Sequence, residues 1–262
     1  MRGGMKVAFL HLEPLPGRID YNRRQIEQAI EIAVANGARW IVTPELCVSG
    51  YFFSEVAGTD WILPQPDDWM RQMMTQAGLK GYTLFLSHPE RDRQNGRLYN
   101  SLFVIGGEGR ILGRHRKIAV HPGPEEDWST PGVSLEPVTV DRVKVGLLVC
   151  ADSYEPEQAA TLKENGAQLI ICPMAWGLKY GPENRWERRT KETGIPLWAC
   201  NRTGREKKVD WTGAQSVVAA GGQRLLEKAL EHSAVLLFDW DMKNMVTTST
   251  DYDVIYLPKN EA

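Results

Sequence analysis

Four short segments of the sequence carry side chains that suit one chemical task. They contain Glu45, Lys117, Glu125 and Cys150, and each segment follows or lies near a run typical of a β-strand. A thiol is a strong nucleophile only as the thiolate, so it needs a base or a positive charge nearby. A lysine beside the thiol also stabilises the negative charge that develops on a substrate atom. The set therefore predicts a Glu-Lys-Cys hydrolytic site.

The local settings of these residues agree with that chemistry. Cys150 ends the apolar run 145–149 and precedes a helix pattern that starts at Pro156, so it lies at a strand-to-helix elbow. Backbone N–H groups at such an elbow lower a thiol pKa or bind an oxyanion. Glu45 follows the strand pattern 40–42, where burial would raise its pKa toward that of a useful base. Alone, each residue has an ordinary explanation as a buried thiol, a loop carboxylate or part of a basic patch, and only the combination favours catalysis.

The elements that must position these residues alternate along the chain. Strand patterns cover residues 6–10, 40–42, 83–86, 98–105, 111–116, 143–149, 169–171, 197–200, 216–219 and 235–238, and helix patterns cover 21–36, 67–76, 156–165 and 183–193. Strands and helices alternate early, whereas the middle strands form a hairpin. This order favours two mixed sheets packed together with helices outside over one open parallel sheet.

The chain shows no linker, repeat or low-complexity run, so we expect one domain over residues 1–262. The last stretch, from Met245 to Ala262, is weakly patterned. We expect its final 15–18 residues to form an extended arm that packs on a partner subunit.

Composition narrows the class of protein. The net charge is −2, with 31 basic and 33 acidic residues, so no electrostatic footprint for nucleic acid or an anionic membrane is evident. No apolar run reaches the length of a membrane span, and the first strand pattern is too short for a signal peptide. None of the four cysteines forms a Cys-x-x-Cys pair or has zinc-like spacing to a histidine. We therefore expect a cytoplasmic protein with reduced thiols and no metal.

The same segments resemble those of the nitrilase-type carbon–nitrogen hydrolases, a family of amidases, nitrilases and carbamoylases. The Pro-Glu-Leu at 44–46, the Arg-Lys at 116–117 and the Cys-Ala-Asp at 150–152 followed by Pro-Glu at 156–157 match three family segments in order. Weaker matches lie at 99–101, 172–173, 201–204 and 213–216, so the resemblance spans nearly the whole chain. It implies that Glu45 is the general base, Lys117 stabilises the tetrahedral intermediate and Cys150 is the nucleophile.

Family members often carry a second active-site glutamate six residues before a Pro-Gly pair. Glu125 has this spacing to Pro131, and Glu126 does not, so Glu125 is the predicted residue. The resemblance also implies an α/β fold, a four-layer α-β-β-α sandwich of two mixed sheets flanked by helices. It further implies a homodimer or higher homo-oligomer, no metal or organic cofactor, and a small-molecule amide or nitrile as substrate.

Residues beside the matched segments are candidates for substrate contact. Tyr51 follows the Pro-Glu-Leu segment, and the N–H of Ala151 would join Lys117 in holding the oxyanion. Tyr154 stands where many members carry an arginine that helps with a substrate carboxylate, which disfavours anionic amides. Trp128 and Trp176 suggest an aromatic pocket, with packing in the core as the alternative.

The favoured function is an amidase that releases ammonia from a small amide through a Cys150 thioester. A nitrilase and an N-carbamoyl amidohydrolase are the enzymatic alternatives. True nitrilases often have Trp-Glu directly after the nucleophile, whereas this chain has Ala151-Asp152, which favours amides. A non-catalytic binding protein of the same fold is disfavoured because all four expected catalytic positions are filled.

Overall fold

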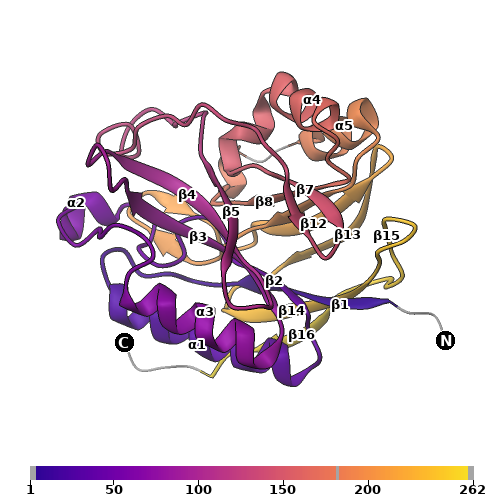
Figure 1. Ribbon diagram of the computed structural model, residues 1–262, viewed down its shortest axis with the longest axis horizontal. Coiled ribbons are helices and arrows are strands. Elements are labelled where there is room, and N and C mark those ends of the chain that lie inside the picture. The colour runs from indigo at the N-terminus through magenta and orange to yellow at the C-terminus, as the bar shows by residue number, and fades with distance from the viewer. Residues whose placement is uncertain (1–3, 181–182, 259–262) are drawn as a thin grey trace.

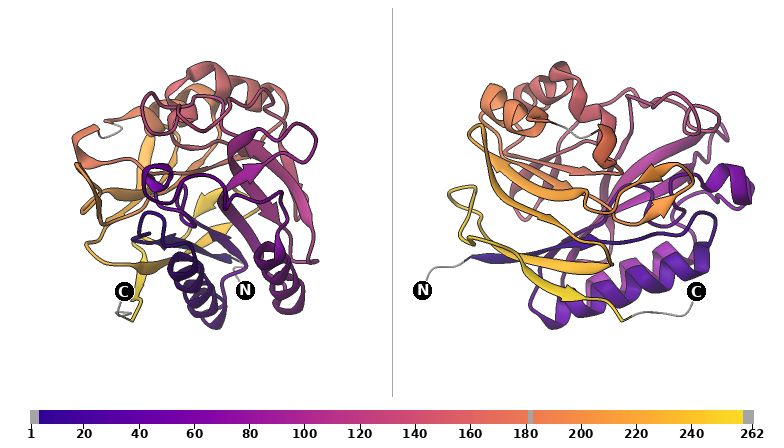
Figure 2. Two further views of the ribbon diagram at one scale, coloured as in Figure 1. Left: turned by 90° about the vertical axis from the view of Figure 1, so that its left-hand side faces the viewer. Right: turned by 180° about the vertical axis from the view of Figure 1, so that it is seen from behind.

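Two mixed β-sheets stack face to face at the centre of the computed structural model, and helices cover both outer faces (Figures 1 and 2). The structure describes residues 4–180 and 183–258. The helices are α1 (Ile19–Ala35), α2 (Phe53–Ala57), α3 (Asp68–Lys80), α4 (Pro156–Glu164) and α5 (Arg185–Thr193), with 3-10 helices η1 (Cys150–Tyr154) and η2 (Leu178–Tyr180).

The first sheet has the strand order β15-β14-β1-β2-β3-β4-β5, with β16 also paired to β14. Its strands are β1 (Met5–His11), β2 (Trp40–Val42), β3 (Thr83–Arg91), β4 (Leu98–Ile105), β5 (Ile111–Arg116), β14 (Ala234–Asp241), β15 (Val246–Thr247) and β16 (Asp253–Tyr256). Strands β1, β2 and β3 are parallel, and the remaining pairs are antiparallel.

The second sheet has the order β13-β12-β9-β8-β7-β6. Its strands are β6 (Val138–Val140), β7 (Val143–Leu147), β8 (Leu169–Pro173), β9 (Leu197–Cys200), β12 (Gln215–Ala220) and β13 (Gln223–Ala229). Strands β7, β8 and β9 are parallel. A small separate hairpin joins β10 (Arg205–Glu206) to β11 (Val209–Asp210).

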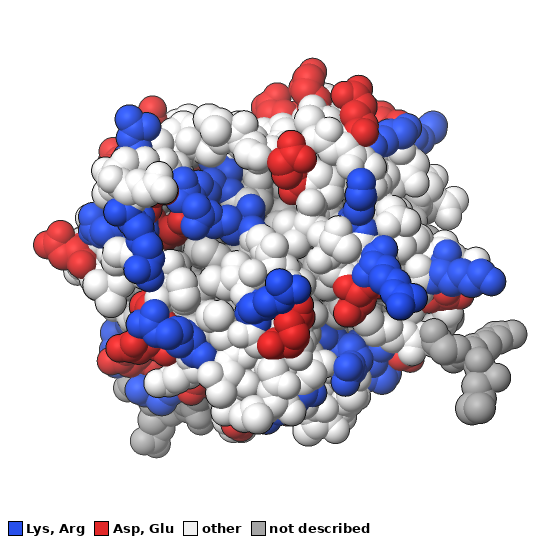
Figure 3. Space-filling view, viewed as in Figure 1, with Lys and Arg blue, Asp and Glu red and all other residues white. Residues whose placement is uncertain are grey.

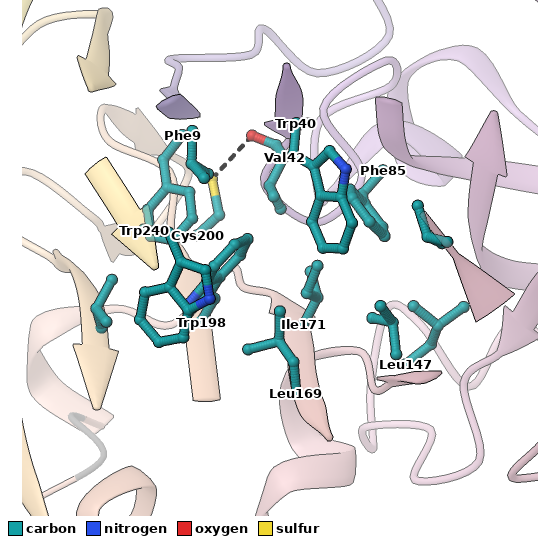
Figure 4. Close-up of a cluster of buried hydrophobic side chains, with 14 of the residues drawn as sticks. Phe9, Trp40, Val42, Phe85, Leu147, Leu169, Ile171, Trp198, Cys200 and Trp240 are labelled. Carbon is teal, nitrogen blue, oxygen red and sulfur yellow. Dashed lines mark hydrogen bonds between the residues drawn. The ribbon is translucent and has the colours of Figure 1, made fainter. Parts of the chain in front are cut away.

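Large apolar side chains fill the space between the sheets (Figure 4). Trp198 of the second sheet packs edge-to-face on Trp240 of the first, with ring centroids 5.0 Å apart, a geometry that aromatic pairs favour. The Cys200 thiol donates to the carbonyl oxygen of Val42 over 3.3 Å, so it also connects the two sheets (Figure 4). This dry layer fixes the position of each sheet relative to the other.

Each outer face of the sandwich is covered by a helix pair. The stripe of Ile26, Ala29, Ile30 and Ala33 on α1 packs with α3 on the first sheet, and α4 and α5 pack on the second. The predicted four-layer α-β-β-α sandwich is therefore confirmed. Among the described helices, none combines the length and the apolar character that crossing a bilayer requires.

The strand patterns missed short and amphipathic strands. β13 was not predicted because four of its seven residues are polar and only Leu226 is buried, at the edge of the second sheet. Within the predicted arm, β15 and β16 pair with β14 of the same chain and so extend the first sheet. The packing of this arm on a partner subunit stays a prediction. Residues 259–262 of that arm, and residues 181–182 next to the predicted helix 183–193, lie outside the described residues.

Candidate active site

Strand ends from both sheets meet at the site. Glu45 lies three residues after β2, and Lys117 directly follows β5 of the same sheet. Cys150 opens η1, three residues after β7 of the second sheet. The backbone N–H of Glu45 donates to the carbonyl of Met174, just beyond β8, over 3.2 Å. This bond ties the loop that carries Glu45 to the second sheet.

Lys117 and two glutamates form a buried ion cluster. The Lys117 Nζ atom lies 2.8 Å from Glu45 Oε1 and 2.6 Å from Glu125 Oε2. All three side chains are at most 1% exposed, so their charges interact with little screening. Glu126 is exposed on the neighbouring position, and the prediction that Glu125 rather than Glu126 reaches Lys117 is confirmed.

Asn100 completes this cluster. Its Nδ2 atom donates to Glu45 Oε1 over 2.8 Å and to Glu125 Oε1 over 2.7 Å. The N–H of Lys117 donates to the carbonyl of Asn100 over 2.8 Å, so the two residues are neighbours across the ends of β4 and β5. Sequence reasoning saw Asn100 only within a weak motif and did not assign it to the site.

The loop after β5 brings Glu125 back to Lys117. The N–H of Gly132 donates to the carbonyl of Lys117 over 2.8 Å, and the N–H of His121 donates to Glu125 Oε2 over 2.9 Å. A Cβ atom at Gly132 would collide with the carbonyl of Arg116, so the loop can close on β5 only with glycine there. This contact returns the loop to β5 and so places Glu125, six residues before the Pro-Gly pair, against Lys117.

The nucleophile candidate sits on a strained elbow. Cys150 has φ of 46°, in the left-handed region that side chains other than glycine seldom adopt. The buried carboxylate of Asp152 holds this elbow through the N–H of Val149, and it also accepts from the N–H groups of Ile118 and Ala119 over 3.0 and 2.8 Å. It therefore joins the elbow to the segment that follows Lys117.

A second bond anchors Asp152 from the other side. His115 Nε2 lies 2.7 Å from Asp152 Oδ2, and both residues are buried. Burial alone would raise the pKa of Asp152, but the hydrogen bond and charge of His115, with the backbone N–H donors, bring it below its usual value. The carboxylate therefore stays ionised and keeps its hydrogen bonds. In the sequence, Asp152 was recognised only as part of the Cys-Ala-Asp motif, which assigns no role to it.

Burial and mutual charges set the proton positions in the site. Burial raises the pKa of the Cys150 thiol well above its usual value, and Glu45 raises it further, while Lys117 and the Ala175 backbone lower it. Burial also raises the pKa of Glu45, against the lowering effect of Lys117. Burial would lower the pKa of Lys117, but the charges of Glu45 and Glu125 raise it well above its usual value. The resting thiol is thus protonated and the lysine charged, so a base must remove the thiol proton during attack.

Cys150 and Lys117 line a pocket of about 230 Å³. Four of the five predicted contact residues line it: Tyr51, Ala151, Tyr154 and Trp176. The sequence did not single out the other lining residues, which are Phe52, His121, Pro122, Pro124, Ala175, Gly177, Val209 and Trp211.

Trp128 is a correction, because it does not line the pocket. It packs in a separate apolar cluster against Phe53, with ring centroids 4.9 Å apart. Trp128 lies close to Glu125 in the sequence, beside a matched motif. Its ring nevertheless turns toward α2 and the core. The pocket receives Trp211 instead, from a segment without a recognised motif.

A buried ion pair shapes the aromatic wall. The Glu206 carboxylate pairs with Arg202 and accepts from the backbone N–H groups of Tyr51 and Phe52, the latter over 2.9 Å. The Arg202 guanidinium lies over the ring of Trp211, 4.2 Å from its centroid. These contacts hold Tyr51, Phe52 and Trp211 beside one another. In the part of the chain that the structure describes, no cluster of three or more His, Cys, Asp or Glu side chains is arranged to hold a metal ion.

Comparison with known proteins defines the family. A sequence model of the family described as carbon-nitrogen hydrolase matches residues 6–248 of this chain. The chain therefore belongs to the carbon–nitrogen hydrolase family of the nitrilase superfamily.

Individual relatives cover most of the chain. The omega-amidase NIT2 of Danio rerio is 27% identical over 98% of this chain and 95% of its own length. A nitrilase of Pyrococcus abyssi is 28% identical over 87% of this chain and 86% of its own length.

Solved structures of one amidase, from Nesterenkonia sp. AN1, share the fold. A cysteine-to-alanine variant of that amidase in complex with butyramide has a TM-score of 0.81 at 25% identity, covering 91% of this chain and 92% of that one. Another variant shows covalent addition of the acetamide moiety of fluoroacetamide at its active-site cysteine, with a TM-score of 0.80 at 26% identity over 90% of both chains.

Proposed function

We propose that the protein is an amidase that releases ammonia from a small amide through a thioester on Cys150. The observation that carries this proposal is the buried cluster of Lys117, Glu45 and Glu125, at a pocket that Cys150 also lines. A nucleophile, a base and a cation at one concave site form the constellation that acyl transfer needs.

Acylation follows from the proton positions. Glu45 takes the proton of the Cys150 thiol as the sulfur attacks the amide carbonyl carbon. The Lys117 ammonium and the N–H of Ala151 stabilise the oxyanion of the tetrahedral intermediate. Glu45 then returns the proton to the nitrogen, the carbon–nitrogen bond breaks, and ammonia leaves.

Deacylation reuses the same base. Glu45 takes a proton from a water molecule, whose oxygen attacks the thioester carbon. The tetrahedral intermediate collapses, the carboxylic acid product leaves, and Cys150 regains its proton from Glu45. Glu125 holds Lys117 in place through both steps.

The known amidase structures support amides over the alternatives, because butyramide and the acetamide moiety are small amide groups in a fold of the same family. The nitrilase and N-carbamoyl amidohydrolase readings remain the second candidates, with the Pyrococcus nitrilase as a relative of the first kind. A homodimer in the cytoplasm is part of the proposal and stays a prediction.

An ammonia-release screen across small amides, nitriles and N-carbamoyl compounds tests the proposal. We expect release from at least one amide by the wild-type chain and none by Cys150→Ala. Release from nitriles or carbamoyl compounds but from no amide would replace the amidase by the corresponding alternative. Release by Cys150→Ala at the wild-type rate would remove the hydrolase assignment.

A further inference from the structure

The four carboxylate oxygens of Glu45 and Glu125 have unequal partners. Glu45 Oε1 accepts from both Lys117 Nζ and Asn100 Nδ2. Glu125 Oε1 accepts from Asn100, and its Oε2 accepts from Lys117 and from the N–H of His121. Of these four oxygens, Glu45 Oε2 is the one that is buried without a partner at hydrogen-bond geometry among the described residues, and the Cys150 thiol is the side-chain donor next to the Glu45 carboxylate. A buried acceptor without a donor is costly, so this oxygen calls for an explanation.

We propose that Asn100 is a positioning residue that leaves Glu45 Oε2 as the single open proton acceptor of the site. The inference rests on the proposed function and deepens it. By binding one oxygen of each glutamate, the Asn100 amide prevents Glu45 from rotating its free oxygen onto Lys117. The proton from Cys150, and later that from water, then goes to Glu45 Oε2. Glu125 has no open oxygen, so it serves as a structural anion.

The orientation of the Asn100 side chain is determined by chemistry. An ionised carboxylate only accepts hydrogen bonds, so the amide nitrogen must face both glutamates, and the opposite orientation would put Oδ1 against two anions. The backbone is held as well. The N–H of Asn100 donates to Ser129 Oγ over 3.1 Å, and its carbonyl accepts the N–H of Lys117. Both the strand end and the side chain are therefore fixed before substrate binds.

Loss of the Asn100 donor has a signature in pH dependence. A hydrogen bond to the ionised form of a carboxyl lowers its pKa, so its removal raises the pKa of Glu45. Glu45 must be ionised to act, so the acid limb of activity then moves to higher pH. The titratable groups that face Glu45 and stay unchanged in such a variant are Lys117, Glu125, Cys150, Tyr51, Tyr154 and Cys172.

The test uses Asn100→Leu, which has similar size and no donor, and Asn100→Asp, which keeps the shape and adds an anion. The first readout is the rate at which iodoacetamide alkylates Cys150 as a function of pH, which needs no substrate. The second is kcat/KM against pH for an amide that the wild-type chain hydrolyses. The control is Asn22→Leu, which removes another buried asparagine with three hydrogen bonds, on α1 and outside the pocket.

For Asn100→Leu we expect kcat/KM to fall about tenfold to a hundredfold and the acid limb of both profiles to move up by about 1 pH unit, as for one charge-assisted hydrogen bond. Asn100→Asp should move the limb further in the same direction, and it provides the test if Asn100→Leu does not fold. Asn22→Leu should leave both limbs in place.

The outcomes separate the two proposals. If wild-type Cys150 is alkylated no faster than a buried cysteine and no amide is hydrolysed, the proposed function fails. If the wild-type chain is active but both Asn100 variants keep the wild-type acid limb, whatever their loss of rate, the role of Asn100 is purely structural and this inference is overturned.

Discussion

At the scale of single residues, two neighbouring glutamates have different partners and therefore different chemistry. Both contact Lys117, and the sequence prefers Glu45 as the base only through its place after a strand and the family resemblance. The structure shows that Glu125 is saturated by three donors, whereas Glu45 keeps one oxygen open beside a thiol whose pKa it raises. The proposed division into base and anchor thus rests on hydrogen-bond occupancy.

Substitution of these charges should separate their roles. Glu45→Gln is expected to lower kcat by roughly a hundredfold to ten-thousandfold, the range for a general base, in acylation and in deacylation. Lys117→Ala should lose roughly a hundredfold to a thousandfold, the value of one oxyanion donor. Single-turnover kinetics with the best amide measures both steps. Normal turnover by Lys117→Ala would show that this lysine forms an ordinary buried ion pair and does not stabilise the oxyanion.

At the scale of elements, strand ends position the chemistry and the strands carry buried histidines. His88 on β3 and His11 on β1 are fully buried, and the Nε2 atom of each has no partner among the described residues. Burial lowers the pKa of each to about 4, from 6.5 in an exposed histidine. Both strands belong to the sheet that carries Glu45 and Lys117. Protonation of the two histidines therefore affects the sheet that positions the site.

These histidines predict acid sensitivity of the fold. As pH falls, these histidines bind protons in the unfolded chain at a higher pH than in the folded chain. Their contribution to the free energy of unfolding is therefore fully present above pH 6.5 and is lost as pH falls toward 4. Between pH 7 and pH 5, each should cost about 2 kcal/mol of unfolding free energy. In urea unfolding, the free energy of unfolding of His88→Gln should therefore fall between pH 7 and pH 5 by about that amount less than in the wild type. The exposed control His232→Gln should show the wild-type fall. An unchanged fall in His88→Gln would contradict the burial effect.

Elements also show which features the sequence can predict. Periodicity located the strands that are buried on both faces, such as β8 and β9, because their apolar runs are continuous. It missed β13 and β16, which have few fully buried residues and no alternation of polar and apolar residues. The order of motifs, through the family resemblance, predicted which residues converge, although these residues follow strands of two different sheets. Asn100 had only the weak match at 99–101 and Trp211 had none, because their places depend on strand register and on the path of a loop.

At the scale of the whole molecule, the site is a small aromatic pocket between two sheets, within a surface of mixed charge. On the face drawn in Figure 3, acidic and basic side chains are interspersed, in line with the net charge of −2. Near the pocket, the guanidinium of Arg202 forms an ion pair with Glu206. The guanidinium of Arg185 lies 4.5 Å from the centroid of the Tyr154 ring. We therefore expect the aromatic walls to favour substrates with an apolar group.

The substrate prediction follows from that charge pattern. We expect a neutral or cationic amide to have a higher kcat/KM than an isosteric amide with a second, acidic end, because Tyr154 offers no charge to pair with a carboxylate. Parallel kinetics on one matched pair of amides measures this preference. A clear preference for the acidic amide, abolished in Arg185→Gln but kept in Lys208→Gln, would show that Arg185 supplies the missing charge and that our interpretation of Tyr154 is wrong.

The central claim is a thioester on Cys150, and intact-mass spectrometry of the acid-quenched reaction tests it most directly. During turnover of the best amide, the wild-type chain should gain the mass of the substrate minus ammonia, and peptide mapping should place the adduct on Cys150 rather than on Cys47, Cys172 or Cys200. Glu45→Gln and Cys150→Ala should show no such adduct on the same timescale. Turnover of the amide by Cys150→Ala, or an adduct on another residue, would contradict the account.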